Sequence, residues 1–118
     1  MEPDTGLREA EEIVLITRGR KTGRPHEATM WCAYENGGVW LRTDRTSDWH
    51  LNLLRDPRCR IRVGATEVGA VKEPIDDEAA ALRHVVDLFR AKYGAEWVGD
   101  WYVERGRIPV RVRIVNAT

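Results

Sequence analysis

Apolar and polar residues alternate along several short segments of the chain, a pattern typical of β-strands with one buried face. Residues 58–63 alternate arginine with cysteine, isoleucine and valine, and residues 108–114 show a similar pattern near the C-terminus. Residues 13–17 are β-branched and apolar, which predicts a buried strand. The other segments expected to form strands are residues 27–34, 38–43 and 67–72.

Short turn sequences connect these strands as hairpins. Asn36-Gly37 separates two of them, and Asn-Gly between apolar runs is the strongest short hairpin signal. Residues 64–66 supply a second turn after the alternating segment. Sequential hairpins favour an antiparallel sheet or barrel over a parallel α/β fold. The expected fold class is therefore mainly β (α+β), with about six antiparallel strands and two or three flanking helices.

One long segment has the spacing of an amphipathic helix. Asp76 or Asp77 is expected to cap this helix, and Gly94 is expected to end it. Its apolar stripe consists of Leu82, Val85, Val86, Phe89 and Tyr93. Because capping also explains Glu78 beside the two aspartates, these carboxylates are not evidence of an acid–base pair.

Two shorter helices are predicted from local signals. Residues 5–12 are compatible with an N-terminal helix. Ser47 can cap a second helix through residues 49–54, because Asp48 is favourable in the first turn and Pro57 follows the end.

Length and charge limit the range of functions. The chain has 118 residues, which fits one domain over residues 1–118 with one core. The 19 basic and 19 acidic residues give no net charge, which argues against a dedicated nucleic-acid-binding protein. The longest apolar runs are far short of the ~20 residues that span a bilayer. The acidic N-terminus lacks a secretory signal, so we expect a cytoplasmic protein with no membrane partner.

Histidines and cysteines do not form a recognisable metal site. His26, His50 and His84 lack the spacing of zinc ligands, so no metal is expected. Cys32 and Cys59 are isolated in the sequence, and we expect both to be small buried hydrophobic residues.

A basic segment at residues 19–25 follows the first predicted strand. It places Arg20, Lys21 and Arg24 close to two glycines, where backbone amides and side-chain donors can converge on an anion. It differs from a Walker loop, because the segment after it starts a strand and not a helix. A solvated basic turn is the competing interpretation.

The chain is rich in tryptophan for its size. Trp31 and Trp40 alternate with neighbours inside predicted strands, which favours a place in the core. Trp97 and Trp101 lie in a connector near the C-terminus, where core filling and stacking on a flat ligand are both open.

The order of these elements and four motifs resemble the deazaflavin-dependent nitroreductase family. This family is a branch of the split β-barrel flavin-binding proteins related to pyridoxamine phosphate oxidase, and the resemblance covers nearly the whole chain. The motifs are Gly19-Arg20-Lys21-Thr22-Gly23-x-Pro25, Trp49-x-x-Asn52-Leu53 with Pro57 downstream, Val63-Gly64, and Arg107-Ile108-Pro109-Val110.

The resemblance implies a split β-barrel that binds coenzyme F420, a deazaflavin whose side chain ends in phospholactyl and oligoglutamate groups. It implies hydride transfer to an activated double bond, a quinone or a nitro compound as the small-molecule acceptor. The cofactor-binding residues carried over from it are Arg20, Lys21, Thr22, Gly23, His26, Arg42, Thr43, Ser47, Trp49 and Asn52. Candidate proton donors are Tyr93, Tyr102 and Ser47, with His50 and water also open.

The chain departs from the family pattern in several places. Relatives commonly carry arginine at the place of His26, and tyrosines where this chain has Trp97 and Trp101. The loop before Ser47 is short and lacks a lysine that relatives often place there, and Asp48 brings an acid to the proposed anion site.

Two other functions and one assembly state are carried as hypotheses. An FMN-binding oxidase or reductase of the wider split-barrel group would use the same basic residues for one phosphate. A non-catalytic module could bind single-stranded nucleic acid through Arg58, Arg60, Arg62 and tryptophans, although these arginines also fit a solvated strand face. A homodimer is expected, because a small core benefits from added interface.

Overall fold

The structure, a computed structural model, describes residues 3–96, 98 and 107–115, with side chains from Gly6 onward. Within these residues the chain forms one antiparallel sheet of seven strands in the order β2-β1-β5-β6-β7-β4-β3, together with three helices. The strands are β1 (Ile13–Arg18), β2 (Pro25–Met30), β3 (Ala33–Glu35), β4 (Gly38–Asp44), β5 (Arg58–Val63), β6 (Thr66–Glu73) and β7 (Arg107–Val115). The predicted class, a mainly β (α+β) antiparallel split barrel with flanking helices, is confirmed.

The sheet encloses the larger of two apolar cores. Alternate residues of β1, β4, β5 and β7 point into it, since the side chains of a strand alternate between the two faces of a sheet. Two helices complete this core: α1 (Pro3–Glu9) contributes Leu7, and α2 (Asp48–Arg55) contributes Trp49 and Leu53. Cys32 and Cys59 are buried in the same core as free thiols, which confirms their expected role.

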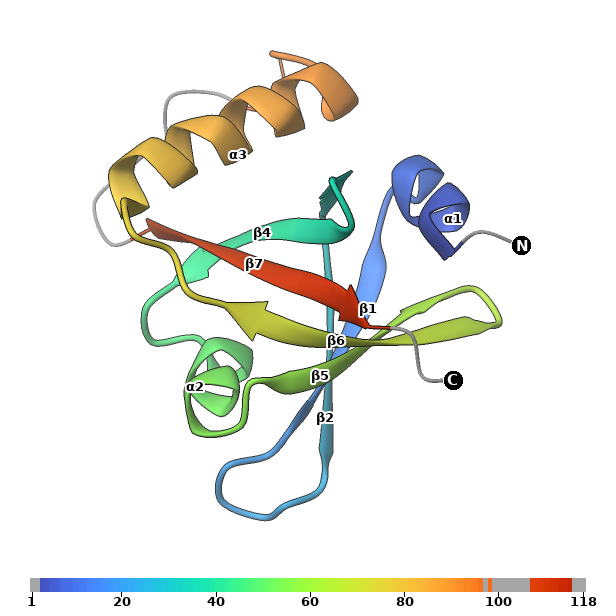
Figure 1. The fold of residues 1–118 in the computed structure, drawn as a ribbon, viewed down its shortest axis with the longest axis vertical. Coiled ribbons are helices and arrows are strands. Elements are labelled where there is room, and N and C mark those ends of the chain that lie inside the picture. The colour runs from blue at the N-terminus through green and yellow to red at the C-terminus, as the bar shows by residue number, and fades with distance from the viewer. Residues whose placement is uncertain (1–2, 97, 99–106, 116–118) are drawn as a thin grey trace.

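The third helix, α3 (Glu78–Tyr93), lies above β4 and β7 in Figure 1 and makes the second core. Val85, Val86 and Phe89 of its apolar stripe pack against Ala33, as the helical spacing predicted. Asp77 caps the helix, and its carboxylate accepts a hydrogen bond from Ala80 N at 3.0 Å. Among the described residues, no helix is long and apolar enough to cross a membrane.

The predicted strand over residues 27–34 is wrong as one element. The chain forms β2, which pairs with β1, and then β3, which pairs with β4 at the far edge of the sheet. The break falls at Cys32, whose N–H donates to the hydroxyl of Tyr93 and whose carbonyl accepts from Lys92. These two residues of α3 replace the bonds that a continuous strand would have made. The Asn36-Gly37 hairpin is present, between β3 and β4.

Candidate functional site

The basic turn, residues 19–24, connects β1 to β2 at the lower end of the sheet in Figure 1. Gly19 N–H donates to the carbonyl of Arg24 at 2.8 Å, and Gly23 N–H donates to the carbonyl of Gly19 at 2.8 Å. Gly23 has a φ of +74°, and a Cβ at Gly19 would lie only 3.0 Å from the Arg24 carbonyl oxygen. Glycine is therefore required at both positions, and these two amides are used inside the turn.

A buried amide joins the basic turn to α2. Asn52 is 2% exposed, and its Oδ1 accepts from Arg20 N at 3.1 Å and from Arg20 Nη1 at 2.9 Å. Its Nδ2 donates to Thr17 Oγ1 at 3.0 Å. Arg20 also forms an ion pair with Asp48, with Nη2 and Oδ1 3.2 Å apart. The Arg20 side chain is thus directed back toward α2, and Asn52 contacts the turn with both ends of its amide.

An open groove of about 730 Å³ lies beside the basic turn, where the C-terminus of α2 meets β5. Its charged lining residues are five cations and one carboxylate: Arg18, Arg20, Lys21, Arg55, Arg58 and Asp56. Asp56 is already paired with Arg58, which lowers the pKa of the Asp56 carboxyl by hydrogen bonding. Within the described part of the chain, the side chains of Arg18, Lys21 and Arg55 have no hydrogen-bond or ion-pair partner. The groove is therefore suited to an anion.

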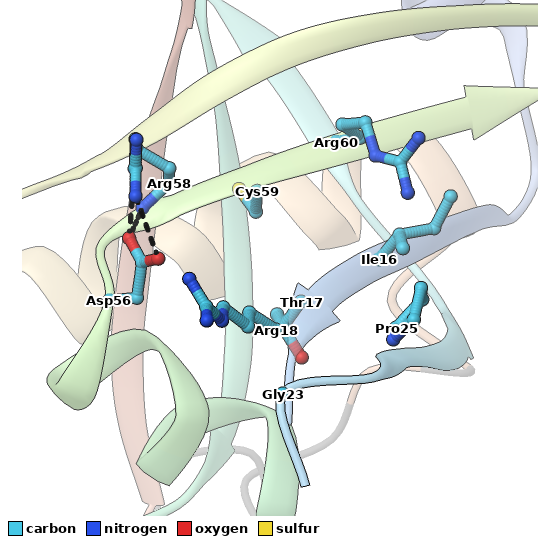
Figure 2. Close-up of a pocket in the computed structure, with 9 residues that line it drawn as sticks. All are labelled: Ile16, Thr17, Arg18, Gly23, Pro25, Asp56, Arg58, Cys59 and Arg60. Carbon is cyan, nitrogen blue, oxygen red and sulfur yellow. Dashed lines mark hydrogen bonds and ion pairs between the residues drawn. The ribbon is translucent and has the colours of Figure 1, made fainter. Parts of the chain in front are cut away.

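A smaller hollow of about 300 Å³ adjoins the groove and shares Arg18, Gly23, Asp56 and Arg58 with it. Figure 2 shows it over the outer side of β1 and β5, with Ile16 and Pro25 on one side and Arg60 beyond them. Groove and hollow form one continuous surface of mixed cationic and apolar character.

Cys59 also lines the hollow, but its chemistry there is limited. Burial raises the pKa of its thiol to about 12, so the thiol stays protonated at neutral pH. Its sulfur lies 3.6 Å from the carbonyl oxygen of Ala70, to which it donates. Cys59 is therefore a packing residue and not a nucleophile.

The other candidates near α2 occupy different positions. Thr43 Oγ1 donates to Ser47 Oγ at 2.7 Å, directly before Asp48 begins the helix. Ser47 precedes the helix as predicted, although its side chain makes no capping hydrogen bond. Trp49 is 8% exposed and packs in the main core, so its ring is not available to stack on a ligand.

Two further candidates belong to strands. His26 lies opposite Thr17 in the β1–β2 pairing, and its buried Nδ1 has no hydrogen-bond partner among the described residues. Arg42 lies on the outer face of β4, because its neighbour Leu41 is fully buried inside the barrel.

Tyr93 lies at the opposite end of β1 from the basic turn. Its hydroxyl donates to the carbonyl of Glu11 at 2.7 Å and accepts from Cys32 N at 3.1 Å, and its ring stacks on Trp31 at 4.0 Å between centroids. The structure does not bring this candidate proton donor together with the groove. Tyr102, Trp97 and Trp101 lie outside the described residues.

The arginines of β5 point outward, and each has an acidic partner. Arg58 pairs with Asp56, Arg60 with Glu67 and Arg62 with Glu27. This pairing fits a solvated strand face better than a free nucleic-acid-binding stripe. Within the described ranges, no group of three or more histidine, cysteine and acidic side chains is placed to hold a metal ion.

The main residues that sequence reasoning missed are Arg18, Arg55 and Arg58 as parts of the groove. Arg18 ends β1 and Arg55 ends α2, so both stand at element ends that face the turn. A basic residue at the end of an element was a visible signal. The convergence of Arg18 with Arg55, 37 positions further along the chain, was not visible before the fold was known.

Comparisons with known proteins identify the family and the fold of the chain. The family model described as F420H(2)-dependent quinone reductase matches residues 4–114. A conserved hypothetical protein from Mycobacterium tuberculosis is 25% identical, with 98% of this chain and 82% of that one covered and a TM-score of 0.75. No curated protein matches the chain significantly.

Two more distant solved structures share the fold. One is described as an F420 reductase, with 16% identity, 98% and 96% of the two chains covered and a TM-score of 0.71. The other is a FAD-binding protein from Mesorhizobium loti, with 15% identity, 96% and 85% covered and a TM-score of 0.68.

Proposed function

This chain belongs to the F420H2-dependent quinone reductase family, and from that premise we propose that it is a reductase that binds coenzyme F420. In this proposal it directs a hydride to an activated double bond, a quinone or a nitro compound. The observation that carries the proposal is the groove beside the basic turn, where the side chains of Arg18, Lys21 and Arg55 make no hydrogen bond or ion pair with the described residues.

The donor set of the groove fits the anionic side chain of this cofactor. That side chain carries a phosphate and several carboxylates, and the groove offers five cations, of which Arg20 and Arg58 are paired with Asp48 and Asp56. Lys21 and Arg18 would bind the nearest anionic group, and Arg55 would bind a further one along the groove. Guanidinium and ammonium groups are the usual partners of phosphate and carboxylate.

The extent of the surface favours coenzyme F420 over FMN. FMN has one compact phosphate, whereas the cations here are spread along a groove of about 730 Å³ that continues into a second hollow of about 300 Å³. An extended polyanion can engage more of these cations at once than a single phosphate can. FMN remains the second candidate, since one phosphate could also bind at Lys21.

The demands on the protein in this reaction are small. When bound, the deazaflavin supplies a hydride, so the chain needs no nucleophile of its own. Its residues must hold the anionic side chain, orient the acceptor and provide a proton. We propose Ser47 as one proton donor, since its hydroxyl can donate a proton and lies 2.7 Å from Thr43 Oγ1 directly before α2. Tyr102 stays a second proposed donor.

A titration with coenzyme F420 and, separately, with FMN tests this function. Quenching of tryptophan fluorescence at two salt concentrations reports both affinity and its electrostatic share. We expect preference for coenzyme F420, weakened by salt because the groove binds charge. Preference for FMN would move the protein to the second candidate, and no binding of either would contradict the proposal.

Activity and assembly need separate measurements. Reduced coenzyme F420 should be oxidised on addition of a quinone, a nitroaromatic compound or an enone, and absorbance follows each reaction. The homodimer also remains a proposal, supported by the small size of the chain and its core. Gel filtration with light scattering that returns only monomer would contradict it.

A further inference from the structure

We propose that Asn52 is a positioning residue: it holds the basic turn in the conformation that binds an anion. The proposal rests on the function proposed above and concerns the same groove. Asn52 and Arg20 support the site, and Lys21 and Arg18 contact the ligand. The observations that carry it are the hydrogen bonds of one buried amide.

The Asn52 side chain connects three elements of the fold. It belongs to α2, donates to Thr17 on β1 and accepts twice from Arg20 in the turn. Asn52 is 2% exposed and Thr17 is 1% exposed. Leaving a buried amide without hydrogen-bond partners costs free energy of folding. The three elements are therefore held in this one arrangement. These bonds fix both the backbone and the side chain of Arg20.

Fixing Arg20 also limits the conformations of its neighbour Lys21. The turn closes through its own amide bonds at Gly19 and Gly23, but those bonds tie the turn only to itself. Asn52 Oδ1 accepts from both the backbone N and Nη1 of Arg20, and these bonds to α2 set where the turn lies against the groove. A cation held in place before binding loses less conformational entropy when the anion arrives.

A purely structural role for Asn52 predicts a different result. Asn52 shares α2 with Trp49 and Leu53 of the main core, so a change there could lower stability without any specific effect on the turn. Two measurements distinguish these roles. One is where along the chain trypsin cleaves, and the other is whether a variant that keeps an acceptor for Arg20 still binds the anion.

The test uses Asn52→Leu, which removes both bonding functions at similar size, and Asn52→Asp, which keeps an acceptor for Arg20. Thr17→Val is the second variant in case Asn52→Leu does not fold. Ile61→Val, in the same core but away from the turn, is the control for a general loss of stability. Two readouts are followed: trypsin cleavage of the Lys21–Thr22 bond, mapped by mass spectrometry, and binding of inorganic tripolyphosphate and of coenzyme F420 by calorimetry.

We expect Asn52→Leu to speed cleavage after Lys21 at least tenfold, and to weaken tripolyphosphate and coenzyme F420 by about tenfold. Thr17→Val should show a smaller change in the same direction, and Asn52→Asp should stay within about threefold of the unaltered protein. Cleavage spread over the chain as in Ile61→Val, or unchanged tripolyphosphate affinity, would overturn the proposal. An unaltered protein that binds tripolyphosphate but not coenzyme F420 would overturn the proposed function while the role of Asn52 stands on the other readouts.

Discussion

The two ends of β1 differ in how far their polar groups are satisfied. At the start of the strand, the hydroxyl of Tyr93 bonds to Glu11 and Cys32, and Lys92 Nζ donates to the Cys32 carbonyl at 2.8 Å. At its end, Arg18 and Lys21 face a groove and make no hydrogen bond or ion pair with the described side chains. Both ends carry residues capable of chemistry. The difference teaches that unused bonding capacity, more than residue type, distinguishes a binding site from a structural contact.

The largest effect should come from removing two of the groove cations that make no hydrogen bond or ion pair among the described residues, Arg18 and Lys21. Arg18→Ala combined with Lys21→Ala should weaken coenzyme F420 by about 100-fold, because each hydrogen bond to a charged group is worth about 1.5 kcal/mol or more. The free energy of unfolding should change by less than about 0.5 kcal/mol, since neither side chain holds the fold. Calorimetry and chemical denaturation measure the two quantities.

Arg83→Ala on the exposed face of α3 is the matched control for the loss of a positive charge. It should leave the affinity for coenzyme F420 unchanged. If Arg83→Ala weakened binding as much as the groove variant, the attraction would come from overall charge, and the comparison between the two ends of β1 would fail.

A change at the start of β1, where the polar groups are hydrogen-bonded, should lower stability and leave ligand binding unchanged. Tyr93→Phe removes a hydroxyl that bonds to Glu11 and Cys32, and should lower the free energy of unfolding by about 1–3 kcal/mol. Affinity for coenzyme F420 and the rate of acceptor reduction should not change. A large loss of rate with unaltered stability would instead assign Tyr93 to catalysis.

How far the sequence predicted the fold depended on whether the deciding contacts were local. β5 has the predicted bounds, because alternation of arginine with apolar residues and an adjoining turn are enough to specify a hairpin strand. The segment 27–34 was mispredicted, because the break at Cys32 depends on Tyr93, which is 61 positions away. Such tertiary hydrogen bonds leave no periodic pattern in the sequence.

The candidate site was likewise predictable only where its contacts are local in the sequence. Glycines and cations at the basic turn were visible, but the orientation of Arg20 depends on Asn52, which lies 32 positions further along. The motif containing Asn52 indicated that the residue was relevant, without showing that its amide would bond to the turn. Arg18 and Arg55 joined the groove only when strand and helix ends were placed side by side.

His50 lies on α2, the helix that Arg20 of the basic turn contacts, and is only 7% exposed. Its titration therefore tests how burial affects stability near this end of β1. Burial, with Lys72 and Arg45 nearby, lowers its pKa below the ordinary 6.5, and Glu78 opposes this. The unfolded chain therefore binds the proton more readily than the folded chain. The stability that neutral His50 supports is complete above pH 6.5 and is lost as the pH falls from there toward the lower folded pKa.

His50→Gln should therefore make the free energy of unfolding less dependent on pH between about 7.5 and 5.5. Denaturant titrations of both proteins at the two pH values measure the change. An equal pH dependence in the variant would show that protonation of other groups controls stability in this range.

The smallest effect expected is a gain. Asp48 is 68% exposed on its side chain and pairs with Arg20 beside the groove, where its negative charge opposes an anionic ligand. Asp48→Asn should strengthen coenzyme F420 up to about fivefold, since exposed ion pairs are worth about 0.2–1 kcal/mol. The gain should shrink at high salt, and Asp87→Asn on α3 should show none. Unchanged or weaker binding in Asp48→Asn would mean that Asp48 matters by orienting Arg20, and that charge balance in the groove is not what limits affinity.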